Sequence, residues 1–474
     1  MTNCTTNIQS QPISLTLLEF EQLKINLSHL DWSIFLDSSD GDHVDSQWSM
    51  LSAHPIATLQ SFSGKTLFKQ GDFLEESSLD PFITLNEKRL AIFGQTNNNQ
   101  QFPFVGGVLG SINYELGYQF EKIKNANKPE TLKLPELSLG FYDWALLYNH
   151  QQAEFSLVTC QINQCIQSET QLTWQQRFDW LMALINTKPL QSSFKLLNEW
   201  QSNMNKSQYS EKFNQIQAYI LSGDCYQVNL AQRFKAKYNG DEYKAYQALL
   251  AENRPPFAAF LRLPEQVILS LSPERFLKLD GHSVETKPIK GTRPRFQDPT
   301  LDKQSKHALQ QSEKDRSENL MIVDLLRNDI GRVCQPGSVK VPSLFDIESF
   351  PAVHHLVSTV QGKLAPDVQV EDLLRACFPG GSITGAPKIR AMEIIAELEP
   401  DRRQSYCGSI GYISANGKMD MNIAIRTLIC VQGNIYCWAG GGLVADSQVD
   451  AEYQECFDKV SKILPCLINL DVNE

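Results

Sequence analysis

The chain has no long hydrophobic run, which argues against membrane-spanning helices. No uninterrupted apolar stretch approaches the roughly 18 residues that a membrane-spanning helix needs. The N-terminal sequence MTNCTTNIQSQ has no basic segment followed by an apolar one, so no secretory signal is visible there. Together these two absences predict a soluble, cytoplasmic protein.

Clustered positive charge and paired cysteines are also missing. The net charge is −11 and no long basic block occurs, which argues against a nucleic-acid surface because neutralising phosphates requires clustered Lys and Arg. The 11 cysteines form no CxxC pair, and Cys160 and Cys165 are the only close couple. Without a secretory signal, such cysteines are expected to be reduced and mostly buried.

The composition is that of an ordinary globular protein. The 474 residues are 42% hydrophobic and 20% charged, enough for a large core and for more than one domain. A polar, weakly periodic stretch at 187–207 is predicted to be a linker or irregular connection between an N-terminal half, 1–186, and a C-terminal half, 208–474. Strand-like and helix-like segments alternate without a repeat, which predicts an α+β layered fold.

A lysine bracketed by prolines stands out in the segment 286–295, TKPIKGTRPR. The segment follows a β-prone run at 267–271, and Pro288 and Pro294 flank its centre, so it is predicted to be a strand end that turns into a loop. Lys290 is thus unlike a charge on a helix surface. A solvated basic loop is the alternative interpretation.

Three glutamates on two predicted helices could hold a hard cation. Glu318 lies in the helical segment 312–327 beside apolar residues, and Glu452 and Glu455 lie three apart on one face of a helix at 450–463. Mg²⁺ commonly uses a few carboxylates together with water and substrate oxygens. The alternative is that both helix faces are simply solvated.

Two glycine-rich segments are candidates for contact with a ligand. Residues 380–387 lead into a predicted helix, 387–398, whose N-terminal N–H groups could bind an anion. Because Gly385 is followed by Ala-Pro-Lys, this segment is not a P-loop. Gly440–Gly442 follow a predicted strand, 435–439, and are interpreted as a loop where a ligand touches the backbone. A helix cap and a β-bulge are the respective alternatives.

Two further polar positions lie in apolar, strand-like stretches. His354 and His355 are adjacent, so one ring is expected to point inward and the other outward, and a satisfied core histidine is the alternative to a functional one. Arg426 alternates with apolar residues in the segment 422–429 and could form a fork for a carboxylate. A cross-strand ion pair is the competing interpretation.

In combination, the motifs along 209–465 resemble those of the chorismate-utilising enzymes. This resemblance implies a layered α/β/β/α fold, with two packed β-sheets, outer helices and an active site between the sheets. It also implies Mg²⁺ bridging carboxylates and chorismate, and ammonia from a glutaminase partner. No glutaminase domain is evident, so a separate glutamine amidotransferase subunit is expected. The motifs are GDCYQVNLAQRF, SPERFLKLDG, ETKPIKGTRPR, SENLMIVDLLRNDIGRV, HHLVSTVQGKL, FPGGSITGAPKIRAMEII, YCGSIGYIS, MNIAIRTL and GGGLVADSQVDAEYQE.

Two positions discriminate between branches of this family. Members that add water, or eliminate to salicylate, carry a lysine where this chain has Gln227, and anthranilate synthases carry alanine where it has Lys290. The resemblance therefore implies the branch that makes 4-amino-4-deoxychorismate for p-aminobenzoate and folate biosynthesis. The alternatives are an anthranilate synthase large subunit and a non-catalytic subunit that binds tryptophan or chorismate. The complete set of reacting and metal-binding residues speaks against the latter.

The resemblance also implies roles for individual residues. Lys290 would attack C2 of chorismate and Glu274 would protonate the departing 4-hydroxyl group. His355 matches the family's active-site histidine. The metal-ligand positions are Glu318, Glu452 and Glu455, and the substrate-contacting positions are Thr292, Tyr406, Arg426, Gly440, Gly441, Gly442 and Lys459. Tyr406 and Gly441 depart mildly from the pattern, since tryptophan and alanine are familiar there. A tryptophan pocket is expected at Leu36, Asp37, Ser38, Pro256 and Phe257.

These roles carry an electrostatic expectation. A nucleophilic lysine must be uncharged, so the pKa of Lys290 is expected to be depressed, and a close glutamate would oppose this. If burial keeps Glu274 protonated, that glutamate no longer conflicts with the lysine and is a competent acid.

Overall fold

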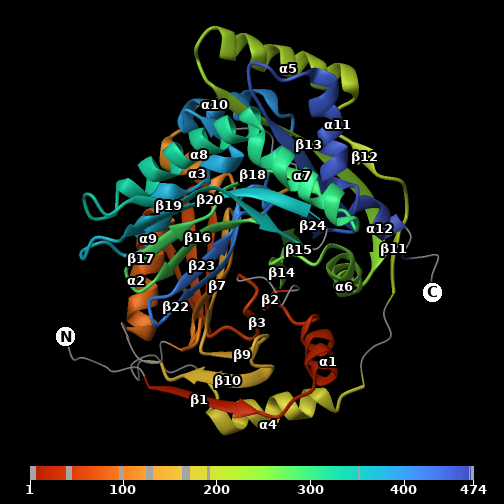
Figure 1. Cartoon of the computed structure of the whole chain (residues 1–474). Coiled ribbons are helices and arrows are strands. Elements are labelled where there is room, and N and C mark those ends of the chain that lie inside the picture. Colours follow the sequence, from red (N-terminus) through yellow and green to blue (C-terminus); the bar gives the residue numbers. More distant parts are fainter. Residues whose placement is uncertain are drawn as a thin grey trace.

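Strands lie at the centre of the protein and form two antiparallel sheets (Figure 1). The computed structural model describes residues 7–38, 45–94, 101–123, 132–162, 171–188, 193–350, 353–468 and 470. Within these residues the first sheet has 13 strands and the second has 12. Two large sheets with outer helices confirm the predicted α+β layered fold.

The first sheet runs from a strand near the N-terminus to the strand of residues 194–196. In spatial order its strands are β1 (Ile8–Ile13), β10 (Glu154–Cys160), β9 (Trp144–Asn149), β3 (Trp48–Ser52), β2 (Ser33–Asp37), β14 (Phe257–Arg262), β15 (Val267–Ser272), β24 (Thr427–Val431), β25 (Asn434–Leu443), β13 (Gln227–Gly240) and β11 (Phe194–Leu196), with β12 (Gln201–Ser202) and β21 (Gly385–Ala386) also paired to β13.

The first strand in the spatial order of the second sheet is β18, which contains Lys290. Its strands are β18 (Ile289–Pro294), β20 (Val353–Lys363), β17 (Ser283–Thr286), β16 (Arg275–Asp280), β23 (Met419–Asn422), β22 (Ser409–Ser414), β7 (Gly107–Ile112), β8 (Leu137–Tyr142), β4 (Ala57–Phe62), β5 (Lys65–Gln70) and β6 (Phe73–Ser77), with β19 (Lys340–Ser349) also paired to β20.

The helices lie around the outside of the sheets (Figure 1). They are α1 (Leu17–Leu27), α2 (Pro81–Phe93), α3 (Leu116–Glu121), α4 (Trp174–Ile185), α5 (Lys206–Leu221), α6 (Glu242–Asn253), α7 (Pro299–Gln311), α8 (Glu313–Gly331), α9 (Val370–Cys377), the short 3₁₀ helix η1 (Gly381–Ile383), α10 (Lys388–Leu398), α11 (Val449–Val460) and α12 (Leu464–Ile468). Among the described residues, none of these helices combines the length and apolar character needed to cross a membrane.

Both halves of the chain contribute strands to both sheets. In the first sheet β2 pairs with β14, with Ile34 opposite Leu261, and in the second β7 pairs with β22, with Gly107 opposite Ser414. The stretch 187–207 contains β11 and β12, which both pair with β13, and Asn205, which caps α5; residues 189–192 lie outside the described part of the chain.

The described cysteines are buried within this architecture. All nine have free thiols, and only Cys466 is not fully buried; Cys165 lies outside the described residues. Burial raises the pKa of Cys456 to about 11 and that of Cys407 to about 12, so these thiols stay protonated at neutral pH.

Candidate active site

Lys290 lies where strand β18 departs from regular pairing. The register of β18 against β20 shifts between Lys290 and Thr292, and Gly291 at this bulge has a φ of +74°. A side chain at Gly291 would also meet Asp315 at 2.8 Å, so the tight contact with α8 requires glycine. The bulge aims the Lys290 amine at Oε1 of Glu318, 2.9 Å away, and at the carbonyl oxygen of Ser382, 3.2 Å away.

The charge on Lys290 is stabilised rather than suppressed. Burial lowers the pKa of Lys290, but the carboxylates of Glu318, Glu274 and Glu455 outweigh burial and raise the pKa above its ordinary value. The expectation of a depressed pKa is therefore wrong for this arrangement, because the opposing effect of close glutamates prevails. The lysine needs to lose the influence of Glu318 before it can react as a free amine.

Glu274 is held as a buried acid immediately before β16. Its backbone carbonyl accepts from the N–H of Ile423 at 3.0 Å, and its Oε1 accepts from the hydroxyl of Ser382 at 2.8 Å. The residue is 6% exposed. Burial raises the pKa of Glu274, opposed by the Ser382 hydrogen bond and by the charges of Lys290 and Lys459. The direction agrees with the expectation that burial keeps this group protonated.

The glycines at 440–442 lie inside a strand, so their interpretation as a loop is wrong. Strand β25 runs from 434 to 443 and stays paired with β13 through all three, with Leu230 opposite Gly441. Close neighbours explain the glycines: a Cβ at Gly440 would lie 2.3 Å from the carbonyl oxygen of Leu230, and one at Gly442 would lie 1.9 Å from Nε2 of Gln227. The glutamates also lie close to this strand. A Cβ at Gly441 would lie 3.1 Å from Oε2 of Glu452 and 3.5 Å from Oε1 of Glu455, and one at Gly442 would lie 3.4 Å from Oε1 of Glu318.

The three predicted metal-ligand glutamates thus face the same strand. Burial and the nearby charge of Glu455 raise the pKa of Glu452, although a hydrogen bond from Ser447 opposes this; the Lys290 ammonium lowers the pKa of Glu318 against the effect of burial. Such oxygen donors suit a hard cation. Among the described residues, no three acidic, histidine or cysteine side chains stand close enough to form a metal centre as arranged. Lysines instead neutralise two of the carboxylates. Lys290 lies 2.9 Å from Glu318, and Lys459 lies 2.7 Å from Glu455.

His354 and His355 lie on β20, next to β18, the strand that carries Lys290. His355 is 4% exposed and its Nδ1 lies 2.9 Å from the hydroxyl oxygen of Thr292, at the level of the β18 bulge. His354 is also buried, at 2% exposed, and contacts Asp302 of α7 through Nε2 at 3.1 Å. The ring of His354 is therefore shielded from solvent, because α7 covers the face of β20 to which it points.

Arg426 is a partly buried cation with no counter-charge among the residues that the structure describes. It lies at the corner between β23 and β24 with a φ of +51°, not within a strand as predicted. Its guanidinium has no ion-pair or hydrogen-bond partner among the described residues, so the interpretation as a cross-strand ion pair is wrong. Burial lowers the pKa of Arg426. An unpaired, desolvated guanidinium of this kind suits an anionic ligand.

Two further predicted substrate contacts, Lys459 and Tyr406, and the branch-discriminating Gln227 have the following partners. The Lys459 amine donates to the carbonyl oxygen of Gly440 at 2.9 Å. Tyr406 is 4% exposed, and its ring lies 5.7 Å from the Arg403 guanidinium. Gln227, at the start of β13, donates to Oε1 of Glu318 at 3.1 Å.

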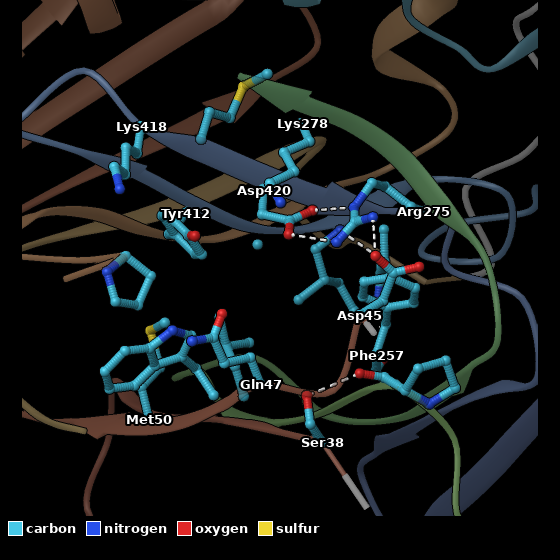
Figure 2. Close-up of a pocket in the computed structure, with 18 of the residues that line it drawn as sticks. Ser38, Asp45, Gln47, Met50, Phe257, Arg275, Lys278, Tyr412, Lys418 and Asp420 are labelled. Atoms are coloured by element: carbon cyan, nitrogen blue, oxygen red, sulfur yellow. Dashed lines mark hydrogen bonds and ion pairs between the residues drawn. The ribbon is translucent and has the colours of Figure 1, made fainter. Parts of the chain in front are cut away.

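A separate cavity of about 210 Å³ lies between the two sheets (Figure 2). All five residues predicted for the tryptophan pocket line it, namely Leu36, Asp37, Ser38, Pro256 and Phe257. Apolar Met50 and charged Asp45, Arg275 and Lys418 complete much of the wall. The cavity therefore offers both apolar and charged surface to an occupant.

Ser382 is a site residue that the sequence reasoning missed. Its hydroxyl donates to Glu274 and its carbonyl accepts from Lys290, so one residue joins the acid to the amine. The loop that carries it is anchored by Lys388, whose buried amine donates to Asp329 at 2.8 Å and to the carbonyl oxygen of Cys377 at 3.1 Å. The glycine-rich sequence at 380–387 is the available signal for this residue, but its pattern indicates an anion site.

Comparisons with known proteins identify the family of the chain. The sequence profile described as chorismate binding enzyme matches residues 33–465. The chain is 50% identical over 438 residues to aminodeoxychorismate synthase component 1 of Klebsiella aerogenes, covering 92% of this chain and 94% of that protein. It is 36% identical over 372 residues to anthranilate synthase component 1 of Streptomyces coelicolor, covering 76% and 73% respectively.

A solved structure extends the agreement to the fold. The crystal structure of anthranilate synthase component I from Streptococcus pneumoniae superposes with a TM-score of 0.78 at 28% identity, covering 89% of this chain and 93% of that one. Because the profile spans most of the chain and the layered sheets match, the protein belongs to the family of chorismate binding enzymes.

Proposed function

We propose that this enzyme converts chorismate and ammonia to 4-amino-4-deoxychorismate. The observation that carries the proposal is the Ser382 link between a buried acid, Glu274, and a lysine amine, Lys290. The similarity to aminodeoxychorismate synthase component 1 supports it, since that similarity is greater in identity and extent than the one to anthranilate synthase component 1. Lys290 also stands where the family resemblance places alanine in anthranilate synthases.

The proposed chemistry divides into two displacements. The neutral amine of Lys290 forms a bond to C2 of chorismate, the ring double bonds shift, and the 4-hydroxyl leaves as water after taking the proton of Glu274. Ammonia then bonds to C4, the double bonds shift back, and the C2–N bond to Lys290 breaks. A proton then passes from the new C4 ammonium back to Glu274. The net reaction adds ammonia and releases one water, so both the lysine and the acid are regenerated.

The remaining residues are proposed to bind and orient the substrate. The unpaired guanidinium of Arg426 would pair with a carboxylate of chorismate. The glycines of β25 leave room for the ring to approach the backbone. Mg²⁺ held by Glu318, Glu452 and Glu455 would supply positive charge that neutralises the substrate carboxylate.

We infer two further ligands. Ammonia comes from a separate glutamine amidotransferase subunit, as the words "component 1" in the names of the relatives suggest. Tryptophan binds in the cavity between the sheets, where Phe257 and Met50 provide apolar surface for an indole and Asp45 provides charge. Isothermal titration with tryptophan tests the second inference: Phe257→Ala is expected to weaken binding at least tenfold, and unchanged binding by this variant would contradict it.

A product assay tests the proposed reaction. The purified protein is incubated with chorismate, Mg²⁺ and ammonium, and the products are identified by mass spectrometry. The expected product is 4-amino-4-deoxychorismate without release of pyruvate. Anthranilate with pyruvate would establish the alternative, an anthranilate synthase. Glutamine should replace ammonium only when an amidotransferase subunit is added.

A further inference from the structure

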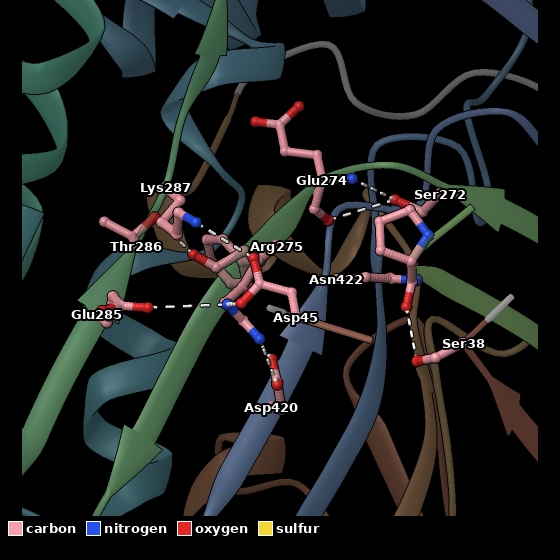
Figure 3. Close-up of polar contacts among 12 residues, drawn as sticks. Ser38, Asp45, Ser272, Glu274, Arg275, Glu285, Thr286, Lys287, Asp420 and Asn422 are labelled. Atoms are coloured by element: carbon pink, nitrogen blue, oxygen red, sulfur yellow. Dashed lines mark hydrogen bonds and ion pairs between the residues drawn. The ribbon is translucent and has the colours of Figure 1, made fainter. Parts of the chain in front are cut away.

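Asp45 is a carboxylate from the N-terminal half that joins two cations of the C-terminal half (Figure 3). Its Oδ1 accepts from Nη1 of Arg275 at 2.5 Å, and its Oδ2 accepts from the amine of Lys287 at 3.2 Å. The side chains of Asp45 and Lys287 are 12% and 13% exposed. Water therefore screens this bridge less than it screens an ion pair on the surface.

Each cation is adjacent in the chain to a reacting group. Arg275 directly follows Glu274, and their side chains point to opposite sides of the strand, so that Glu274 is directed away from the Asp45 bridge (Figure 3). Lys287 precedes Lys290 by three residues, and Pro288 between them restricts the backbone. The position of each cation therefore affects the position of one reacting group.

Backbone pairing alone does not hold these two segments together at the active-site end. The ladder between β16 and β17 ends at the pair Lys278–Glu285. Beyond it, the Thr286 hydroxyl donates to the carbonyl oxygen of Phe276 at 2.7 Å. Next toward the reacting groups are the Asp45 bridge and a longer contact of 3.7 Å between Arg275 and Glu285.

We propose that Asp45 is a positioning residue that sets the spacing between the carboxyl of Glu274 and the amine of Lys290. The inference rests on the proposed function. Displacement of a reacting group by about 1 Å can cost about 100-fold in rate. Asp45 thus acts through Arg275 and Lys287, without contributing an atom to the chemistry.

The variant Asp45→Asn tests this role without removing the other supports of the two cations. Arg275 keeps its two-pronged contact with Asp420, at 2.9 and 3.0 Å, and Lys287 keeps Glu348 at 2.6 Å. The melting temperature is therefore expected to stay close to that of the wild type. With ammonium as the nitrogen source, kcat is expected to fall about 10- to 100-fold. KM for chorismate should change less than about threefold, because the predicted substrate contacts are untouched.

A double-mutant cycle separates a bridge from two independent contacts. Lys287→Met breaks the same bridge from its other end and should lower kcat by a similar factor. The double variant Asp45→Asn/Lys287→Met should then lose no more than either single variant, whereas independent losses would multiply. Glu285→Gln is the matched control: it removes a carboxylate 3.7 Å from the same arginine but leaves the bridge intact, so wild-type kcat is expected.

The outcomes distinguish this inference from the proposed function. A wild-type protein that makes no 4-amino-4-deoxychorismate defeats the function itself. An active wild type with an equally active Asp45→Asn variant, or with losses that multiply in the double variant, overturns only the role of Asp45. Because Asp45 also lines the cavity, the assays are run with and without tryptophan. A loss seen only when tryptophan is present would also overturn the proposal.

Discussion

The amine of Lys290 and the carboxylate of Glu318 form an ion pair 2.9 Å long at the centre of the site. One partner is the proposed nucleophile and the other is a proposed metal ligand, so the charge of one group controls the reactivity of the other. Glu318 is the strongest of the charges that raise the pKa of Lys290. Without its charge, burial would lower this pKa against less opposition and so favour the neutral amine.

Replacing the nucleophile should abolish the reaction. Lys290→Ala removes the group proposed to bond to C2, and we expect kcat to fall at least about 1,000-fold, which corresponds to about 4 kcal/mol of transition-state stabilisation. Mass spectrometry of the protein quenched during turnover should show a covalent adduct in the wild type and none in the variant. Lys303→Ala, at an exposed position of α7, serves as the control, and a fully active Lys290→Ala variant would refute the nucleophile role.

The activity should depend on pH through Glu274. The protonated form is the acid, and burial raises the pKa of this group, so kcat is expected to fall as the pH rises through that raised value. Ser382→Ala removes a hydrogen bond that favours the carboxylate, so the fall should move to higher pH. Glu274→Gln should lose about 100- to 10,000-fold in kcat. A fall in kcat at the same pH in the wild type and Ser382→Ala would contradict the assignment.

Mg²⁺ binding should depend on the glutamates that lie beside the glycines of β25, among them Glu318 and Glu452. Chelation of divalent cations is expected to abolish activity, and added Mg²⁺ should restore it. Calorimetric titration with Mg²⁺ should show at least tenfold weaker binding for Glu318→Gln and for Glu452→Gln, because each loses an anionic oxygen donor. The control Glu211→Gln changes an exposed residue of α5 and should bind Mg²⁺ as the wild type does.

The stability of the fold should decrease with pH because of Glu115. Burial raises the pKa of this carboxyl to about 7 from an ordinary 4.5, although it accepts from the backbone N–H groups of Arg403 and Gln404. The folded protein therefore keeps a proton that the unfolded chain has lost, and its free energy of unfolding falls between about pH 4.5 and pH 7, by up to about 3 kcal/mol.

Denaturant unfolding at several pH values measures this contribution. Glu115→Gln cannot titrate, so the difference between wild type and variant should narrow or reverse as the pH rises across that range. A difference that stays constant would show that Glu115 does not couple folding to protonation.

The sequence predicted elements whose signals are local. Helix α8 begins at Glu313, one residue after the predicted start, because the Ser312 hydroxyl accepts from the N–H of Asp315 and caps the helix; it continues to Gly331, beyond the predicted end at 327. Strand β15 begins where the predicted run of 267–271 begins and ends one residue beyond it. Most of the candidate site was found only because its motifs resemble a known family, since spacing alone left solvated helix faces as a full alternative.

The predictions that failed depend on distant contacts. Gly440–Gly442 look like a loop because glycine weakens strands, but the partner strand β13 holds them and the glutamates of α11 need the space. Arg426 lies at a corner between two strands, and the periodicity of hydrophobic residues does not reveal such a corner. Nothing local marks Asp45, whose partners lie about 230 residues further along the chain.

The interleaving of the two halves has a consequence for biosynthesis. Strand β7 cannot pair with β22 until β22 has been synthesised, and Gly107 of β7 pairs with Ser414, about 300 residues later in the chain. At about 5–20 residues per second, the ribosome needs roughly 15–60 s to deliver that partner. During this interval the edge of β7 is exposed to other nascent chains, so holdase chaperones that cover such edges should raise the yield of native enzyme.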